Sequence, residues 1–217
     1  MIRIWDLPTR LFHWILVVLV AFSVVSAEIG GNWLDWHMRS GYCILTLVLF
    51  RIMWGFAGSH HARFSNFVRP PAAALAYLRE LRNGSAAAQA GHNPLGALSV
   101  VALLAALLLQ ASTGLFANDD STSTEGPLAK LVSNHTSNLL TLVHEVNQYV
   151  LYTLVALHIA AIAYYYFAKR ENLVTPMLTG DKAGTGLVSA ADDARIRIRA
   201  AALLAIAVAI ASYIFTR

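Results

Sequence analysis

Five long runs of apolar residues alternate with polar segments along the chain. A helix of about 20 apolar residues spans the hydrocarbon core of a bilayer. The pattern therefore predicts an all-α integral membrane protein, with a four-helix transmembrane bundle and a fifth transmembrane helix at the C-terminus. The expected spans are approximately Leu11–Ala27, Trp36–Gly58, Leu95–Ala117, Leu139–Ala168 and Ala200–Phe215.

Composition agrees with a membrane location. The chain has 217 residues, of which 57% are hydrophobic and 13% charged, whereas soluble domains average about 25% charged residues. The net charge of +4 does not indicate nucleic-acid binding, and we expect no nucleic-acid partner. Cys43 is the single cysteine, which excludes an intrachain disulfide, a Cys-based zinc site and a CxxCH haem attachment. Its apolar neighbours predict a buried thiol.

The N-terminal run has one alternative interpretation, as a cleaved signal peptide. Arg3 and Arg10 precede it, and Val25–Ala27 resembles a small-residue cleavage site. His13 lies near the start of the run, however, and the apolar core of a signal peptide has no use for a histidine. We therefore expect a transmembrane helix here.

The loop charges predict an orientation. With a cytoplasmic N-terminus, inside segments carry 12 Lys and Arg residues and outside segments carry Arg39, Lys130 and Arg217, while Arg51 lies within a span. The positive-inside rule then places the N-terminus in the cytoplasm and the C-terminus outside. Residues 118–137 become an external loop with a short helix near Pro127–Ser133, and residues 83–93 a flexible cytoplasmic connection. We find no internal repeat and no separate soluble domain.

Eight histidines are present, and four lie near span ends or in loops, where water explains them: His60, His61, His92 and His135. The other four, His13, His37, His144 and His158, fall within or beside spans, where an ionisable group is costly and marks a functional site. His144 and His158 are 14 residues apart on one predicted helix. They therefore share a face, about 21 Å apart along the axis.

The predicted topology pairs these histidines by depth. His13 lies with His158 towards the cytoplasm, and His37 lies with His144 towards the outside. Two imidazole pairs at two levels are what two b-type haems need as axial ligands. The rival interpretations are hydrogen-bonded packing histidines and a zinc or copper site. The metal site is weaker, because two ligands do not complete a tetrahedral site.

Three other residues fit a haem site. Gly41 lies one turn after His37, where a porphyrin plate needs room, and Gly114 could serve similarly in the third span. Arg51 lies 14 residues after His37, on the same face at the inner level. A buried arginine needs an anion, and a haem propionate would be a natural partner. Snorkelling, or pairing with backbone carbonyls, is the alternative for Arg51.

Several motifs together carry a family resemblance: WDLPTRLFHW at Trp5–Trp14, WHMRSGY at Trp36–Tyr42, RIMWGFAGSHHARFSNFVRP at Arg51–Pro70, TGLFANDD at Thr113–Asp120, GPLAKLVS at Gly126–Ser133, and LHIAAIAYYYFAKRENLVTPMLTGDK at Leu157–Lys182. The sequence resembles the prokaryotic cytochrome b561 family, which includes the b-type cytochrome subunits of nickel–iron hydrogenases. The match covers residues 3–182. The fifth helix is less typical, since compact members have four.

The resemblance implies a four-helix core with two b haems, whose axial ligands match His13, His37, His144 and His158. It also implies a bacterial inner-membrane protein that transfers electrons between quinone, such as ubiquinone or its quinol, and a partner at the membrane face. We accordingly expect a di-haem domain at residues 1–182, then a linker and fifth helix at 183–217. Some members resemble companions of c-type cytochromes, others anchor a hydrogenase, and some compact relatives oxidise superoxide.

Three functions remain open from the sequence. The first is an electron conduit, with a periplasmic c-type cytochrome or another redox protein steered by Asp119, Asp120 and Glu125. The second is a superoxide:quinone oxidoreductase, which needs an external cationic funnel, although Arg39 and Lys130 would make a sparse one. The third is a haem-free scaffold.

Overall fold

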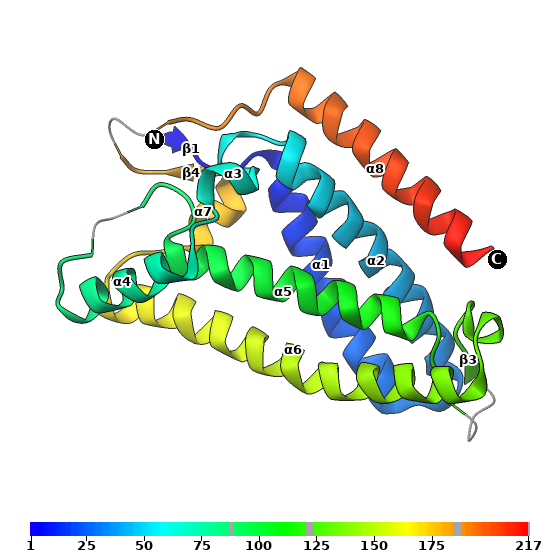
Figure 1. Ribbon diagram of the computed structural model, residues 1–217. Helices are drawn as coiled ribbons and strands as arrows, with labels where there is room; N and C mark the ends of the chain where they lie inside the picture. The colour runs from blue at the N-terminus through cyan, green and yellow to red at the C-terminus, as the bar shows by residue number, and fades with distance from the viewer. Residues whose placement is uncertain (87–88, 120–123, 185–187, 217) are drawn as a thin grey trace. The chain divides into compact units, whose positions relative to one another are not determined.

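The computed structural model describes every residue except 87–88, 120–123, 185–187 and 217 (Figure 1). Among the described residues, five helices are long and apolar enough to cross a membrane, which confirms the all-α membrane fold. Most of them begin a few residues before the apolar runs, because the polar residues of the first turn are also helical. These helices are α1 (Leu7–Ile29), α2 (Leu34–Ala57), α5 (Pro94–Gly114), α6 (Asn134–Ala168) and α8 (Ala194–Phe215).

Short elements connect the long helices. They are β1 (Ile2–Arg3), η1 (Gly31–Trp33), η2 (His60–Ala62), α3 (Phe64–Phe67), α4 (Pro71–Arg82), β2 (Asn118–Asp119), β3 (Thr124–Glu125), η3 (Ala129–Leu131), α7 (Val174–Thr179) and β4 (Asp181–Lys182). Two antiparallel strand pairs form, β1 with β4 and β2 with β3.

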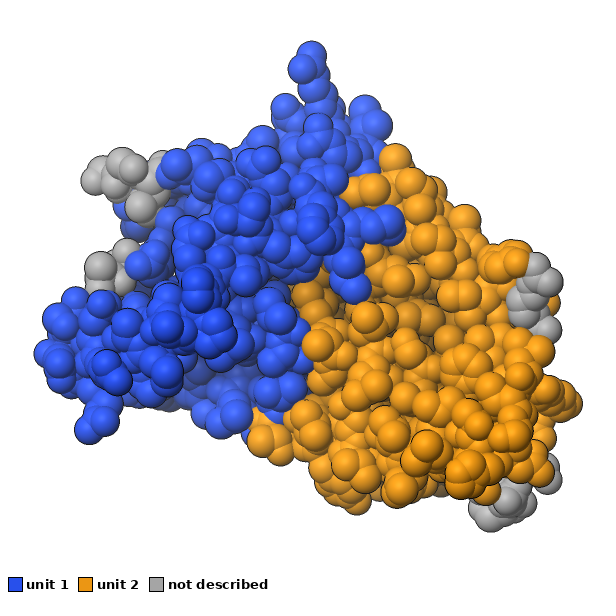
Figure 2. All heavy atoms as spheres, in the orientation of Figure 1, with its two compact units in different colours: residues 1–11, 52–103, 154–201 blue, residues 12–51, 104–153, 202–217 orange. Residues whose placement is uncertain are grey.

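The chain divides into two compact units, and each contains a part of all five long helices (Figure 2). Unit 1 comprises residues 1–11, 52–103 and 154–201. Unit 2 comprises residues 12–51, 104–153 and 202–217. Unit 1 therefore contains most of the short elements, and unit 2 contains the β2–β3 pair together with η1 and η3.

In unit 1 the N-terminus pairs with the segment that follows α7. Ile2 and Arg3 lie opposite Lys182 and Asp181. The N–H groups of Ile4 and Trp5 both donate to the carbonyl of Gly180, at 2.8 and 3.1 Å. Gly180 ends α7 at φ 91°, where a Cβ would lie 2.8 Å from the Trp5 carbonyl oxygen. Glycine is therefore required at this close approach.

Asp192 connects three segments of unit 1. Its carboxylate accepts hydrogen bonds from the Leu7 N–H (3.1 Å), from Arg3 Nη1 (2.5 Å) and from Arg197 Nε (3.3 Å). Burial of the carboxylate, the largest single influence, raises its pKa. The Leu7 N–H and the Arg197 and Arg3 charges outweigh burial, so the pKa of Asp192 is lowered. The linker before α8 is thereby fixed to the start of α1.

A second buried network surrounds Asp6, which is fully buried. One carboxylate oxygen caps α1 by accepting from the Thr9 N–H at 2.7 Å, and the other accepts from the Ser59 hydroxyl. The indole N–H of Trp54 donates to the Thr9 hydroxyl at 3.1 Å. The buried polar groups of this network are thus bonded to one another, as burial requires.

Helix α4 was not expected from the sequence, although the Pro70–Pro71 pair that precedes it is a typical helix start. Its Tyr77 hydroxyl lies 2.9 Å from the Tyr165 hydroxyl at the end of α6, and Asn93 Nδ2 donates to Tyr165 at 2.8 Å. These two hydrogen bonds connect α4, α6 and Asn93 within unit 1. Residues 87–88, in the predicted flexible connection 83–93, lie outside the described residues.

Three local expectations can be compared with the structure. The thiol of Cys43 is exposed, so the prediction of a buried thiol was wrong: apolar neighbours in a membrane helix accompany the lipid-facing side as well as the core. The short helix near Pro127–Ser133 is present as the single turn η3. His61 and His92 are half-buried in ring contacts with Trp5, at 6.3 and 4.7 Å, instead of lying in open solvent.

Candidate functional site

Two of the four singled-out histidines meet in unit 2. His37 lies in the first turn of α2 and His144 in α6. Their ring centroids are 6.2 Å apart, and the ring planes are nearly perpendicular at 88°. The expected pairing of His37 with His144 is therefore present as a spatial neighbourhood.

Each imidazole is held through its own Nδ1 atom, which bonds to a backbone carbonyl. Nδ1 of His37 bonds to the Ser23 carbonyl at 2.9 Å, and Nδ1 of His144 bonds to the Gln110 carbonyl at 2.9 Å. A carbonyl can only accept, so each Nδ1 donates, and in the neutral form of either ring the lone pair then lies on Nε2. Metal-binding histidines are typically oriented by such a bond from the other ring nitrogen.

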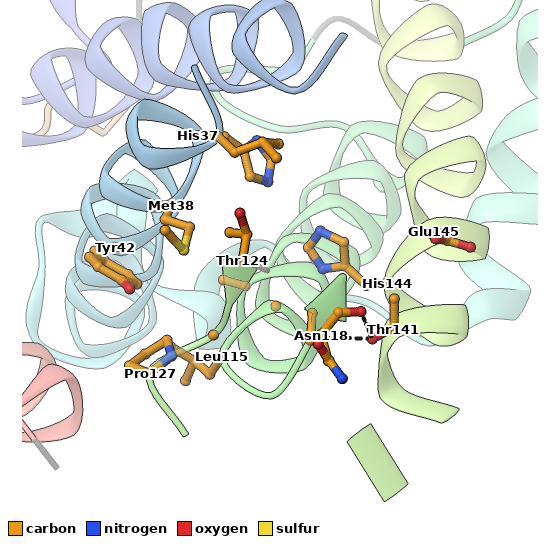
Figure 3. A pocket seen from close by; sticks show the side chains of 16 residues that line it. His37, Met38, Tyr42, Leu115, Asn118, Thr124, Pro127, Thr141, His144 and Glu145 are labelled. Atoms are coloured by element: carbon orange, nitrogen blue, oxygen red, sulfur yellow. Dashed lines mark hydrogen bonds between the residues drawn. The ribbon is translucent and has the colours of Figure 1, made fainter. Parts of the chain in front are cut away.

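A cavity of about 240 Å³ opens beside the two rings (Figure 3). Close-packed interiors hold few voids larger than a water molecule, so this space is not a packing defect. Figure 3 shows His37 and His144 reaching the same space from different helices. The walls are mainly apolar, with polar atoms from Asn118, Thr124 and Glu145. This combination is typical of a cofactor site.

The two predicted glycines both line the cavity but differ in what they accommodate. A Cβ at Gly41 would meet no atom within 4 Å, so the space beside it is open. A Cβ at Gly114 would lie 2.9 Å from Cε1 and 3.2 Å from Nδ1 of His144. Gly114 therefore gives room to the His144 ring, whereas the expectation was room for a porphyrin.

The spacing of the rings fits one metal ion between them. Metal–imidazole bonds are about 2.0–2.1 Å long, which places the centroids of two rings on opposite sides of one metal about 6 Å apart. Among the residues that the structure describes, no group of three or more His, Cys, Asp or Glu could hold a metal ion. The remaining ligands would have to come from the cofactor, as a porphyrin supplies them.

Sequence reasoning missed the residues that hold the histidines. Gln110 serves twice, since its carbonyl accepts from His144 and its side-chain oxygen accepts from Asn147 Nδ2 at 2.7 Å. Asn147 is buried and donates also to the Ala106 carbonyl. The only signal in the sequence was polar residues inside apolar runs, at Gln110 and at Asn147, one turn after His144.

The other predicted residues lie elsewhere. His13 is in the unit 2 part of α1, with its ring 4.9 Å from that of Trp14. His158 is half-buried in the unit 1 part of α6. These two belong to different units, so their pairing stays a prediction. Arg51 is only 3% exposed, in the unit 2 part of α2.

The fold and the site together define a multi-pass helical membrane protein in which imidazoles from two helices converge beside one cavity. The family model for prokaryotic cytochrome b561 matches residues 4–180, and the chain belongs to that family. It is accordingly a b-type membrane cytochrome that binds haem and transfers electrons. Neither the search of curated proteins nor that of solved structures found a match. Helix α8 lies outside the matched residues.

Proposed function

We propose that the chain holds two b haems and transfers electrons across the bacterial inner membrane, between quinone and a redox protein outside. His37 and His144 are the axial ligands of the outer haem, and His13 and His158 those of the inner haem. The geometry of the first pair carries the proposal: two rings 6.2 Å apart, each protonated at Nδ1 by its carbonyl bond.

The protein contributes preorganisation to this site. A haem bound there would supply one-electron chemistry between ferric and ferrous iron. The Ser23 and Gln110 carbonyls fix the orientation of each ring, aim Nε2 away from the carbonyl bond, and raise the basicity of the ligand nitrogen. The ligands need not reorganise when the charge of the site changes.

The inner pair is supported by the helical geometry of α6. His144 and His158 lie on one unbroken helix, 14 residues apart, so they share a face about 21 Å apart along the axis. A second ligand level at His158 needs a partner imidazole from another helix. Of the two other histidines besides His37 within the candidate spans, His135 lies on α6 itself, so His13 of α1 is the one on a different helix.

Arg51 is proposed to bind a haem propionate. A cation that is 97% removed from solvent requires compensation by anions or hydrogen bonds. Arg51→Gln leaves a shorter polar side chain that can still hydrogen-bond but carries no charge, so we expect the midpoint potential of one haem to fall in a redox titration. Unchanged potentials for both haems would show that Arg51 contacts no propionate.

Charge distinguishes between external partners. Unit 2 carries 4 of the 16 Lys and Arg residues and 6 of the 12 Asp and Glu residues, a formal charge of −2. Lys130 is paired with Glu125 at 3.5 Å, and Arg39 lies over the Trp36 ring. An acidic surface attracts a basic protein, such as a c-type cytochrome, and repels superoxide. Asp120, part of the predicted acidic patch, lies outside the described residues.

The orientation is proposed from the same charges. Unit 1 carries the other 12 Lys and Arg residues. Under the positive-inside rule its loops face the cytoplasm, which places the N-terminus inside and the C-terminus in the periplasm.

One purification tests the whole proposal. We expect a pyridine haemochrome count of two b haems per chain and two midpoint potentials. In liposomes, quinol should reduce both haems, and a basic c-type cytochrome should reoxidise them from outside. Protein from haem-sufficient cells that lacks a Soret band would favour a scaffold. Fast, saturable reduction by superoxide, coupled to quinol formation, would favour the oxidoreductase.

A further inference from the structure

Helix α8 contacts α2 within each of the two units. In unit 1, Arg199 Nη1 donates to the Ala57 carbonyl at 3.0 Å. In unit 2, the Phe215 ring stacks on the Tyr42 ring, with centroids 4.0 Å apart and planes at 25°.

The buried side of α8 leads to the stacked ring. Ala207 and Ala211 are 0% and 1% exposed, and Phe215 follows Ala211 by four residues, so all three share one face. Small side chains allow close helix packing in membranes. Ile206, Val208 and Ile210 on the other sides are exposed. This packing of α8 places the Phe215 ring against the Tyr42 ring.

Tyr42 is also a wall of the cavity beside His37 and His144. It follows Gly41, whose Cβ position faces open space. Figure 3 shows Tyr42 at the edge of the cavity, on the side where the red end of α8 passes. Stacked aromatic pairs attract each other beyond what the burial of their area contributes. The stack therefore fixes the side chain that closes this wall.

We propose that Phe215 is a positioning residue for the outer haem: it holds Tyr42 as the wall of the haem cavity and keeps water from that side. The inference rests on the proposed function. It also gives α8 a role, since α8 lies beyond the family match. A ferric b haem carries one more positive charge than the ferrous form, and a dry, apolar wall disfavours the charged form. The wall therefore raises the reduction potential.

The test is a redox titration of the full chain with Phe215→Ala, followed by absorbance. We expect the outer haem, defined as the component that His144→Ala removes, to be reduced at a lower potential. A tenfold change in its reduction equilibrium corresponds to about 59 mV. Phe215→Tyr preserves the stack and should restore the wild-type value. Ile210→Ala, an exposed position on the same helix, is the matched control and should change neither potential.

The outcomes separate this inference from the proposed function. If Phe215→Ala folds poorly, Phe215→Leu retains apolar volume without the ring, and Tyr42→Leu removes the wall from the other side. Both should lower the same potential. Unchanged potentials in all three variants, or equal shifts of both haems, would overturn the inference while leaving a di-haem protein. A wild-type chain without bis-imidazole haem would instead overturn the proposed function.

Discussion

Unit 1 and unit 2 contain parts of the same five helices but use their polar residues differently. In unit 1 the polar side chains bond to one another, as in the Asp192 ion pairs with Arg3 and Arg197. In unit 2 the polar bonds around α5 and α6 orient His144 beside the cavity, through Gln110 and Asn147. The Asp192 contacts thus stabilise unit 1, whereas the contacts around His144 shape one side of a cavity in unit 2.

The formal charges of the two units also differ. Unit 1 has a formal charge of +6, from 12 Lys and Arg against 6 Asp and Glu residues, and unit 2 has −2. Substitutions in the Asp192 network of unit 1 should change stability with haem retained. Substitutions around the unit 2 cavity should change haem binding with the fold retained. Four predictions test this separation.

The largest effect is expected at the axial ligands. His37→Ala or His144→Ala should lower the haem count from two to one per chain, because a single imidazole leaves the outer iron without its second protein ligand. The measurement is the pyridine haemochrome count on purified protein. His135→Ala is the control, since His135 is exposed at the start of α6 and should not alter the count. Loss of both haems, or of neither, would contradict the proposed pairing.

The two glycines of the cavity give a matched pair. Gly114→Ala pushes a Cβ against the His144 ring, and such overpacking costs about 1–3 kcal/mol. Gly41→Ala meets no protein atom and, as an alanine within a helix, should stabilise the haem-free chain by up to about 1 kcal/mol. Both should lower haem content, but only Gly114→Ala should also lower thermal stability.

Gly41→Ala is the more specific test of where the cofactor lies. Since its methyl group contacts no side chain, any loss of haem must come from a clash with the cofactor itself. Full haem content and unaltered potentials would show that the porphyrin does not pass beside Gly41.

A smaller effect, on thermal stability and not on haem content, is expected for the Asp192 network of unit 1. Asp192→Asn removes a carboxylate that accepts from Leu7, Arg3 and Arg197, and such a loss costs about 1–3 kcal/mol. Because the pKa of Asp192 is lowered in the fold, this stabilisation is present at neutral pH and is lost only in strong acid. Thermal melting should show the decrease, with the haem spectrum unchanged at 25 °C. Glu80→Gln, at an exposed position, should leave the melt unaltered.

How much of this could be predicted from the sequence depends on the range of the interaction. Membrane spans follow from local hydropathy, so all five were found. The pairing of His37 with His144 followed from depth alone, since alternate spans fix the level of each residue. Boundaries such as the start of α8 at Ala194 were missed, because Arg195, Arg197 and Arg199 make its first turns polar.

Long-range backbone contacts could not be predicted. Strand β1 has two residues, too few for a periodic pattern, and its partner β4 lies near residue 181. The Ser23 and Gln110 carbonyls that hold the histidines are also invisible in a sequence, because every residue has a carbonyl. Which carbonyl is free to accept depends on where a neighbouring helix crosses.

The smallest predicted effect concerns His61 in unit 1. Burial is the main cause of its lowered pKa, and the nearby His60 lowers it further, whereas the bond from its Nε2 to the Val188 carbonyl raises it. The neutral ring is therefore favoured in the fold. Its stabilisation is complete above the unfolded pKa of about 6.5 and is lost as the pH falls through the folded pKa.

Melting temperatures between pH 7.5 and about 5.5 measure this contribution. The wild type should lose stability on acidification, and His61→Gln, which cannot be protonated, should lose less. His60→Gln is the control on the neighbouring ring, 5.0 Å away. Haem content should stay constant over the same range, because His61 is not one of the proposed haem ligands. If acid instead released the outer haem while the melt of His61→Gln matched the wild type, the pH-sensitive group would lie in unit 2, and the separation between the two units would fail.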